Sequence, residues 1–165
     1  MKRVLITGMS GTGKSAVIVE LDRRGYRALD LDTPEWSHWV DAAPGDALTP
    51  GDGQDWVWQE ERVRQLLSRN ESEVLFVSGC AENMPNLFDV IETVILLSAP
   101  LDVLMERLAA RTAEGYGHTA EERHKIAKLV ETIEPLLRRS AHFEIDTTQP
   151  VVETVSEILR FAKSS

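Results

Sequence analysis

Cysteine is nearly absent from this sequence of 165 residues, which contains only Cys80. A single cysteine cannot form a disulfide within the chain, so the small secreted scaffolds that depend on disulfides are excluded. Long hydrophobic runs are absent as well: apolar segments such as 94–97 are far shorter than the roughly 18–20 residues of a membrane-spanning helix. We therefore expect a cytoplasmic protein that does not enter a membrane.

Positive charge is also scarce. The chain carries 18 lysines and arginines against 27 acidic residues, which gives a net charge of −9. An acidic surface repels phosphate backbones, so general nucleic-acid binding is not expected. The shortage is greatest in residues 28–61, which contain no Lys or Arg, nine carboxylates and all four tryptophans.

The order of the apolar segments predicts an α/β fold. At roughly 150 residues per domain the length corresponds to one domain, 1–165, and no linker or repeat divides it. The predicted strands, short apolar runs typical of buried parallel strands, cover residues 4–7, 26–31, 74–78, 93–98 and 142–145. The predicted helices cover residues 15–24, 34–40, 55–68, 100–111, 120–139 and 150–161. This alternation indicates a three-layer fold, a five-stranded, mostly parallel sheet with helices on both faces.

Residues 8–15, with the sequence GMSGTGKS, match the phosphate-loop pattern G-x-x-x-x-G-K-[ST] at every fixed position. They also stand between a predicted strand and a predicted helix, as the P-loop NTPase fold requires. The N–H groups of such a loop bind phosphate oxygens, the lysine reaches the β- and γ-phosphates, and the hydroxyl of Ser15 ligates Mg²⁺. The residues assigned to nucleotide binding are Gly8, Ser10, Gly11, Thr12, Gly13, Lys14 and Ser15. The motif alone does not distinguish phosphoryl transfer from hydrolysis or sensing.

With this loop in place, nearly the whole chain resembles the small-molecule kinases of the shikimate kinase and adenylate kinase type, among the small P-loop ATPases. The resemblance implies one kinase-like domain that uses ATP and Mg²⁺. It also implies an insertion over the acceptor site at about 32–62 and a lid at about 111–122.

Asp30-Leu31-Asp32, at the end of the second predicted strand, matches an Asp-x-Asp of shikimate kinase-like proteins. The resemblance implies that Asp30 helps to hold Mg²⁺ and that Asp32 contacts the acceptor hydroxyl. A carboxylate in that place can orient the hydroxyl and accept its proton. The alternative is a solvated pair of acids in a turn.

Arg107 and Arg111 stand four residues apart, which places both on one face of a helix. Adenylate kinase-like proteins have two such arginines before the lid, where they hold the triphosphate. The resemblance makes Lys14, Asp32, Arg107 and Arg111 the candidate catalytic residues. Alternatively, the two arginines are exposed and pair with nearby glutamates.

Two further segments carry a weaker likeness to the same family. Residues 77–80 end in Gly79 and Cys80, where many P-loop proteins have an aspartate that supports Mg²⁺, and we interpret the cysteine as a packed residue. The loop at 146–150 corresponds to the adenine-contacting loop, which implies roles for Thr148 and Gln149. A turn with a helix cap explains the same residues.

The acceptor is described only by class. An anionic acceptor needs arginines, which residues 28–61 lack, so we expect a neutral or cationic hydroxyl compound such as a nucleoside or a sugar. The tryptophans either line that pocket or pack the insertion. The spacing of Trp56 and Trp58 predicts that at most one of them faces the pocket.

The sequence therefore predicts an ATP-dependent phosphotransferase with a small-molecule acceptor, as a monomer or a homodimer. One alternative is a nucleoside monophosphate kinase that uses Arg62 or Arg64. Another, from a different class, is a nucleotide-dependent switch or ATPase module, although the sequence contains no guanine-reading Asn-Lys-x-Asp motif.

Overall fold

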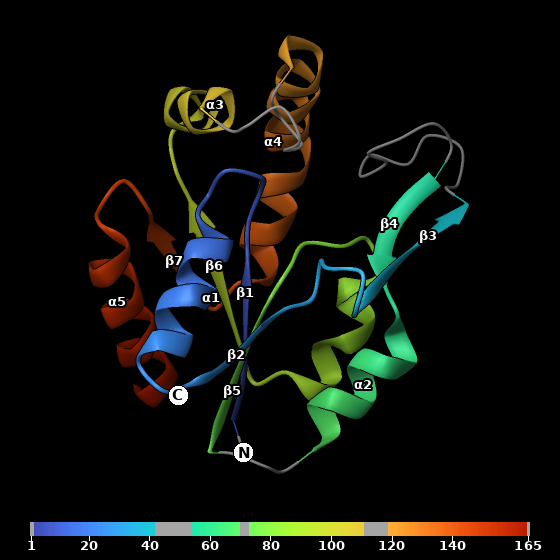
Figure 1. The fold of residues 1–165 in the computed structure, drawn as a ribbon, viewed down its shortest axis with the longest axis vertical. Helices are drawn as coiled ribbons and strands as arrows, with labels where there is room; N and C mark the ends of the chain where they lie inside the picture. Colours follow the sequence, from blue (N-terminus) through green and yellow to red (C-terminus); the bar gives the residue numbers. More distant parts are fainter. Residues whose placement is uncertain (1, 42–53, 70–72, 111–118, 165) are drawn as a thin grey trace.

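A computed structural model describes residues 2–41, 54–69, 73–110 and 119–164. Its main sheet has five parallel strands in the order β2-β5-β1-β6-β7 (Figure 1). The strands are β1 (Lys2–Thr7), β2 (Arg27–Asp30), β5 (Val74–Ser78), β6 (Thr93–Ser98) and β7 (Phe143–Asp146). All five correspond to predicted strands, and the predicted α/β class with a parallel sheet is confirmed.

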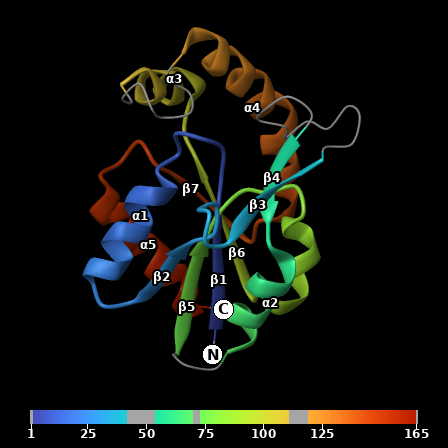
Figure 2. The ribbon, with the colours of Figure 1, turned by 45° about the vertical axis from the view of Figure 1, so that its right-hand side comes forward.

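Helices cover both faces of this sheet (Figures 1 and 2). They are α1 (Lys14–Arg23), α2 (Glu60–Ser68), the 3₁₀ segment η1 (Met84–Val90), α3 (Leu101–Ala109), α4 (Ala120–Ser140) and α5 (Val151–Ser164). Among the described helices, none is long and apolar enough to cross a membrane.

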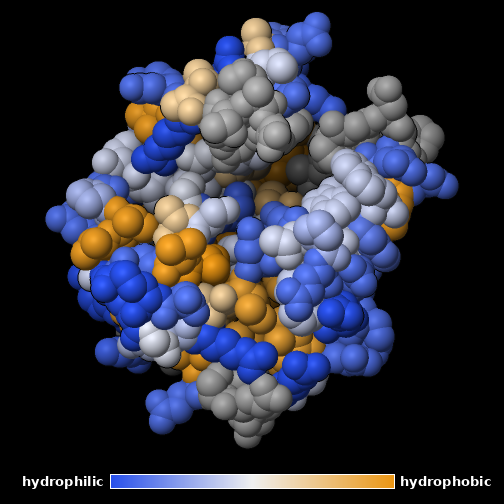
Figure 3. Space-filling view, in the orientation of Figure 1, coloured by the Kyte–Doolittle hydropathy of each residue, from blue (hydrophilic) through white to orange (hydrophobic). Residues whose placement is uncertain are grey.

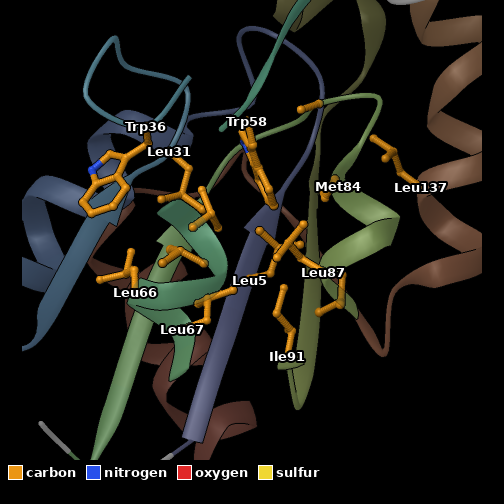
Figure 4. Close-up of a cluster of buried hydrophobic side chains, with 14 of the residues drawn as sticks. Leu5, Leu31, Trp36, Trp58, Leu66, Leu67, Met84, Leu87, Ile91 and Leu137 are labelled. Atoms are coloured by element: carbon orange, nitrogen blue, oxygen red, sulfur yellow. The ribbon is translucent and has the colours of Figure 1, made fainter. Parts of the chain in front are cut away.

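Alternating side chains of the strands supply two separate cores. On β1, Val4 and Ile6 pack with α1 and α5, while Leu5 points to the opposite face. The core on the side of Leu5 includes Leu66, Leu87 and side chains of α4 (Figure 4). Because the inner strands β5 and β6 are buried on both faces, their sequences are mostly apolar.

A two-stranded hairpin corrects two of the predicted helices. Residues 37–41 form β3 (Ser37–Asp41), which pairs antiparallel with β4 (Gln54–Trp58). The helix predicted over 34–40 is therefore wrong, and the one predicted over 55–68 begins only at Glu60. Tryptophan and valine, which are frequent in strands, favour a strand over β4. Pro34 lies in a turn in which the N–H groups of Trp36 and Ser37 both donate to the carbonyl of Thr33.

Candidate active site

The loop at residues 8–13 follows β1, the central strand, and leaves the sheet at its carboxyl edge, where parallel α/β sheets bind ligands. Its backbone requires glycine at Gly8, Gly11 and Gly13. Gly13 has a φ of +97°, in the left-handed region. A Cβ on Gly8 would lie 2.5 Å from the carbonyl oxygen of Leu97 on the neighbouring strand β6.

Inside the loop, Thr12 is fully buried, and its hydroxyl donates to the carbonyl of Met9 across 2.8 Å. This bond fixes the curvature of the loop. Ser10 is half-buried at the mouth of the loop, and Ser15 is exposed on the first turn of α1. The sequence motif therefore forms a tight loop between β1 and α1, held by the hydroxyl of Thr12.

The ammonium of Lys14 is folded over the loop. Its Nζ donates to the carbonyl oxygen of Gly8 at 2.5 Å and to that of Met9 at 3.1 Å. The positive charge is thus held at the opening of the loop, where it can attract an anion.

Asp32 lies just past the end of β2, opposite the loop. Its backbone N–H donates to Oδ1 of Asp30 at 2.9 Å, so the two acids predicted as a pair form one local turn. Burial raises the pKa of Asp32 above its ordinary value, whereas the nearby ammonium of Lys14 lowers it. Burial is the larger effect, so this carboxyl group has an increased affinity for a proton.

Both indoles of β4 contact Asp32. The Nε1 of Trp58 donates to Oδ1 of Asp32 at 3.1 Å, and the Nε1 of Trp56 donates to the backbone carbonyl oxygen of Asp32 at 2.7 Å. The structure thus directs both side chains to one place, because residues i and i+2 of a strand share a face. The prediction that at most one of these tryptophans faces the pocket agrees with the structure. Only Trp56 lines the cavity described below, while Trp58 is buried in the core.

The segment that follows β5 also contacts the carboxylate of Asp32. The backbone N–H of Cys80 donates to Oδ2 of Asp32 at 3.1 Å. Burial raises the pKa of the Cys80 thiol, which keeps it protonated and supports its interpretation as a packed residue.

One cavity joins the loop to this acidic site. Its walls include Ser10, Lys14, Asp32, Asp55, Trp56 and Glu82. The space-filling view shows the surface hollowed between the loop and the hairpin (Figure 3). Lys14 is the one basic side chain among the described residues that line it, against three carboxylates.

A second cavity lies on the other side of the loop, beside α1 and α5. Arg107 forms part of its wall and links two loops: Nη1 donates to the carbonyl of Gly11 at 3.0 Å, and Nη2 donates to that of Thr147 at 2.5 Å. Gln149 also lines this cavity.

Thr148 is exposed, and its N–H donates to Oδ1 of Asp146 at 2.8 Å. The neighbouring Thr147, which the sequence did not single out, lines the cavity instead.

Several predicted or alternative residues lie elsewhere. Arg111 and most of the predicted lid fall outside the described residues. The guanidinium of Arg62 stacks over the ring of Trp36, 5.0 Å from its centre, and Arg64 forms an ion pair with Asp89 at 2.9 Å. Neither arginine lines the cavity that contains Asp32.

Asp55, which was not among the candidate site residues, is 2% exposed and lines the cavity with Asp32. No signal in the sequence marks it, because a buried and an exposed aspartate look the same there.

The residues present suit Mg²⁺ with a nucleotide better than a metal held by protein alone. A hydroxyl from Ser15 and a carboxylate from Asp30 are hard oxygen ligands, which Mg²⁺ prefers. The described part of the chain contains no group of three or more His, Cys, Asp or Glu side chains that could hold a metal. Mg²⁺ typically combines one or two protein ligands with phosphates and water, and this donor set fits that pattern.

Comparison with known proteins shows the family and the fold. A sequence profile of the family described as an AAA domain matches residues 4–129. No curated protein sequence matches the chain significantly.

Among solved structures, a shikimate kinase from Acinetobacter baumannii in complex with shikimate has a TM-score of 0.66 and 20% identity, over 99% of this chain and 94% of that one. A gluconokinase from Sinorhizobium meliloti 1021 has a TM-score of 0.61 and 22% identity, over 98% and 94%. A deoxyadenosine kinase from M. mycoides with bound dATP has a TM-score of 0.58 and 14% identity, over 98% and 100%. At these identities the likeness shows a common fold.

Proposed function

The chain belongs to the AAA domain family, and from that premise we propose that it is a kinase that transfers the γ-phosphoryl group of ATP to a hydroxyl group of a small molecule. One observation carries the proposal: the phosphate loop and Asp32 line the same cavity. A phosphoryl donor on the loop and a hydroxyl acceptor beside the carboxylate therefore share one space. Solved structures of similar fold that are kinases for small molecules support it.

At the donor end, the loop amides and Lys14 bind the β- and γ-phosphates. The ammonium exchanges its bonds to the Gly8 and Met9 carbonyls for bonds to phosphate oxygens. Ser15 and Asp30 would hold Mg²⁺, which would neutralise charge on the phosphates. Arg107 lines the second cavity with Thr147 and Gln149, so we assign that cavity to the nucleoside part of ATP. The role of Arg111 at the transferred phosphoryl group stays a prediction.

At the acceptor end, Asp32 orients the hydroxyl and receives its proton. The bond between the acceptor oxygen and the γ-phosphorus forms while the bond from that phosphorus to the ADP oxygen breaks. The increased proton affinity of Asp32 suits this role, because the carboxylate must take up the proton as the new bond forms.

The charge of the cavity favours a neutral or cationic acceptor. Asp32, Asp55 and Glu82 face the same space, and a phosphoryl group adds further negative charge. Arg62 and Arg64, the arginines required by the monophosphate kinase alternative, are engaged elsewhere. The ring of Trp56 offers a flat wall for a sugar, a nucleobase or an ammonium group.

The experiment is to measure ADP release from Mg-ATP with a panel of acceptors: adenosine, cytidine, AMP, CMP, shikimate, glucose and kanamycin. Lys14→Ala protein, purified in parallel, measures contaminating kinases. We expect a neutral or amine-bearing compound to raise the rate well above the background. Stimulation by AMP, CMP or shikimate would support a kinase and refute the neutral or cationic acceptor. ATP binding without stimulation by any compound would refute transfer to acceptors of these classes and favour a nucleotide switch.

A further inference from the structure

Asp32 is held by three hydrogen bonds, which come from two segments of the chain. The indole of Trp58 reaches Oδ1 from β4, and the N–H of Cys80 reaches Oδ2 from the end of β5. The indole of Trp56 binds the backbone carbonyl, again from β4. Both the backbone and the carboxylate plane of Asp32 are therefore fixed before any ligand arrives.

Trp58 is itself anchored. Its ring is 1% exposed and belongs to the core over α2 and η1 (Figure 4). The side-chain amide of Asn83 binds both backbone polar groups of Trp58. Its Oδ1 accepts from the Trp58 N–H at 3.1 Å, and its Nδ2 donates to the Trp58 carbonyl at 2.8 Å. An indole held in this way has little freedom, so its N–H can act as a fixed reference for the carboxylate.

Gly79 leaves the space for this contact. A Cβ at that position would lie 2.8 Å from Oδ1 of Asp32 and 2.9 Å from Cζ2 and Nε1 of Trp58. Those distances are shorter than real Cβ contacts allow. The indole of Trp58 and the carboxylate of Asp32 can therefore form their hydrogen bond only because residue 79 has no side chain.

The arrangement leaves acceptor capacity on the carboxylate. Each carboxylate oxygen can accept about two hydrogen bonds. One is used on Oδ1 by Trp58 and one on Oδ2 by Cys80. Each oxygen of Asp32 therefore retains capacity to accept the hydroxyl of a ligand in the cavity.

We propose that Trp58 is a positioning residue for phosphoryl transfer, whose indole N–H fixes the carboxylate of Asp32 in the orientation that the acceptor hydroxyl requires. This inference rests on the proposed function, in which Asp32 receives the proton of that hydroxyl. A ring that served packing alone would not need its nitrogen. The contribution of the nitrogen can therefore be separated from the contribution of the ring.

The test measures ADP release from Mg-ATP by wild type and Trp58→Phe, with the compound among adenosine, cytidine, glucose and kanamycin that stimulates wild type most. Phenylalanine keeps an aromatic ring in the core but removes the N–H. We expect kcat to fall by about 10- to 100-fold while KM for ATP and for the acceptor changes little, because the lost bond acts on the orientation of the base. Trp36→Phe, at another buried tryptophan of the same core, is the matched control and should keep kcat.

A double variant separates positioning from packing. If the indole acts through Asp32, Trp58→Phe should lower kcat no further in an Asp32→Asn background, whereas independent effects would multiply. Unchanged kcat in Trp58→Phe, or multiplied effects in the double variant, would overturn the proposal. Wild-type protein that no acceptor stimulates would instead remove the proposed function and this inference with it.

An NMR measurement keeps the proposal testable if Trp58→Phe does not fold. The four tryptophans give four indole N–H signals, and single Phe variants of the other three tryptophans assign the remaining signal to Trp58. In the isosteric Asp32→Asn protein we expect the Trp58 signal to move and the Trp36 signal to stay. An unchanged chemical shift of the Trp58 indole N–H in Asp32→Asn would refute the contact on which the positioning depends.

Discussion

The ammonium of Lys14 lies 2.5 Å from the carbonyl oxygen of Gly8, at the first residue of its own loop. The loop carbonyls thus hold the ammonium at the opening of the loop. In the proposed function, phosphate oxygens replace these carbonyl oxygens as its partners.

Lys14→Ala should remove this charge and lower the rate of ATP turnover by about 100- to 1000-fold, the range measured when one group that stabilises the transition state is deleted. The fold should remain, because Lys14 is half-buried and the loop keeps the Thr12 bond to Met9. ADP release and thermal unfolding measure the two effects. Lys128→Ala, at an exposed position of α4, is the control. Full activity in Lys14→Ala would show that phosphates bind elsewhere.

Arg107→Lys should weaken ATP binding by about tenfold, which corresponds to about 1.4 kcal/mol. The arginine reaches the carbonyls of Gly11 and Thr147 with two different nitrogens, and the single ammonium of a lysine cannot span both. Isothermal titration with ATP measures the change, with Arg139→Lys on the exposed side of α4 as control. Equal affinities would exclude Arg107 from the nucleotide site.

The parallel sheet was predictable because its inner strands are buried on both faces. Residues 74–77 and 94–97 are continuous apolar runs, and the structure gives the predicted bounds of the two strands, 74–78 and 93–98. The phosphate loop was predictable for a related reason: its pattern is local, and its glycines serve backbone geometry that every such loop shares.

The hairpin and the contacts of Asp32 were not predictable in the same way. β3 and β4 pair across residues 42–53, so neither strand carries a complete signal of its own. The charges in 54–61 also resemble a solvated helix face. Trp56 and Trp58 share one side only if residues 54–58 form a strand. The contact of that side with Asp32 depends on the tertiary structure, which the sequence pattern does not show.

Gly79→Ala should lower turnover by forcing apart the carboxylate of Asp32 and the indole of Trp58, which a Cβ would approach within 2.8 and 2.9 Å. Gly25→Ala is an informative comparison. Gly25 has a φ of +92° but open space around a Cβ, so alanine there should cost only about 1 kcal/mol of backbone strain.

ADP release and thermal unfolding, measured on both variants, separate the two causes. We expect reduced stability in both and reduced turnover in Gly79→Ala alone. Normal turnover in a folded Gly79→Ala protein would show that the site tolerates displacement of the carboxylate.

Glu20→Gln should reduce stability at neutral pH and lose this effect in acid. The carboxylate of Glu20 accepts hydrogen bonds from Arg23 at 2.7 Å and from Arg24 at 2.7 Å, and these bonds lower its pKa from 4.5 to about 2. Arg24 also donates to the carbonyl of Val152 at 2.9 Å, so the cluster ties α1 to α5.

A carboxyl group whose pKa is lower in the folded state stabilises the fold above its unfolded pKa, and the effect disappears as the pH falls through the folded pKa. The contribution of Glu20 should therefore be complete above about pH 4.5 and decline toward pH 2. Thermal unfolding of wild type and Glu20→Gln between pH 7 and pH 2 measures it, with Glu131→Gln, at an exposed position of α4, as control. We expect the difference in Tm between wild type and Glu20→Gln to shrink through this interval. A difference that stays constant with pH would mean that the ionised carboxylate does not hold α1 to α5.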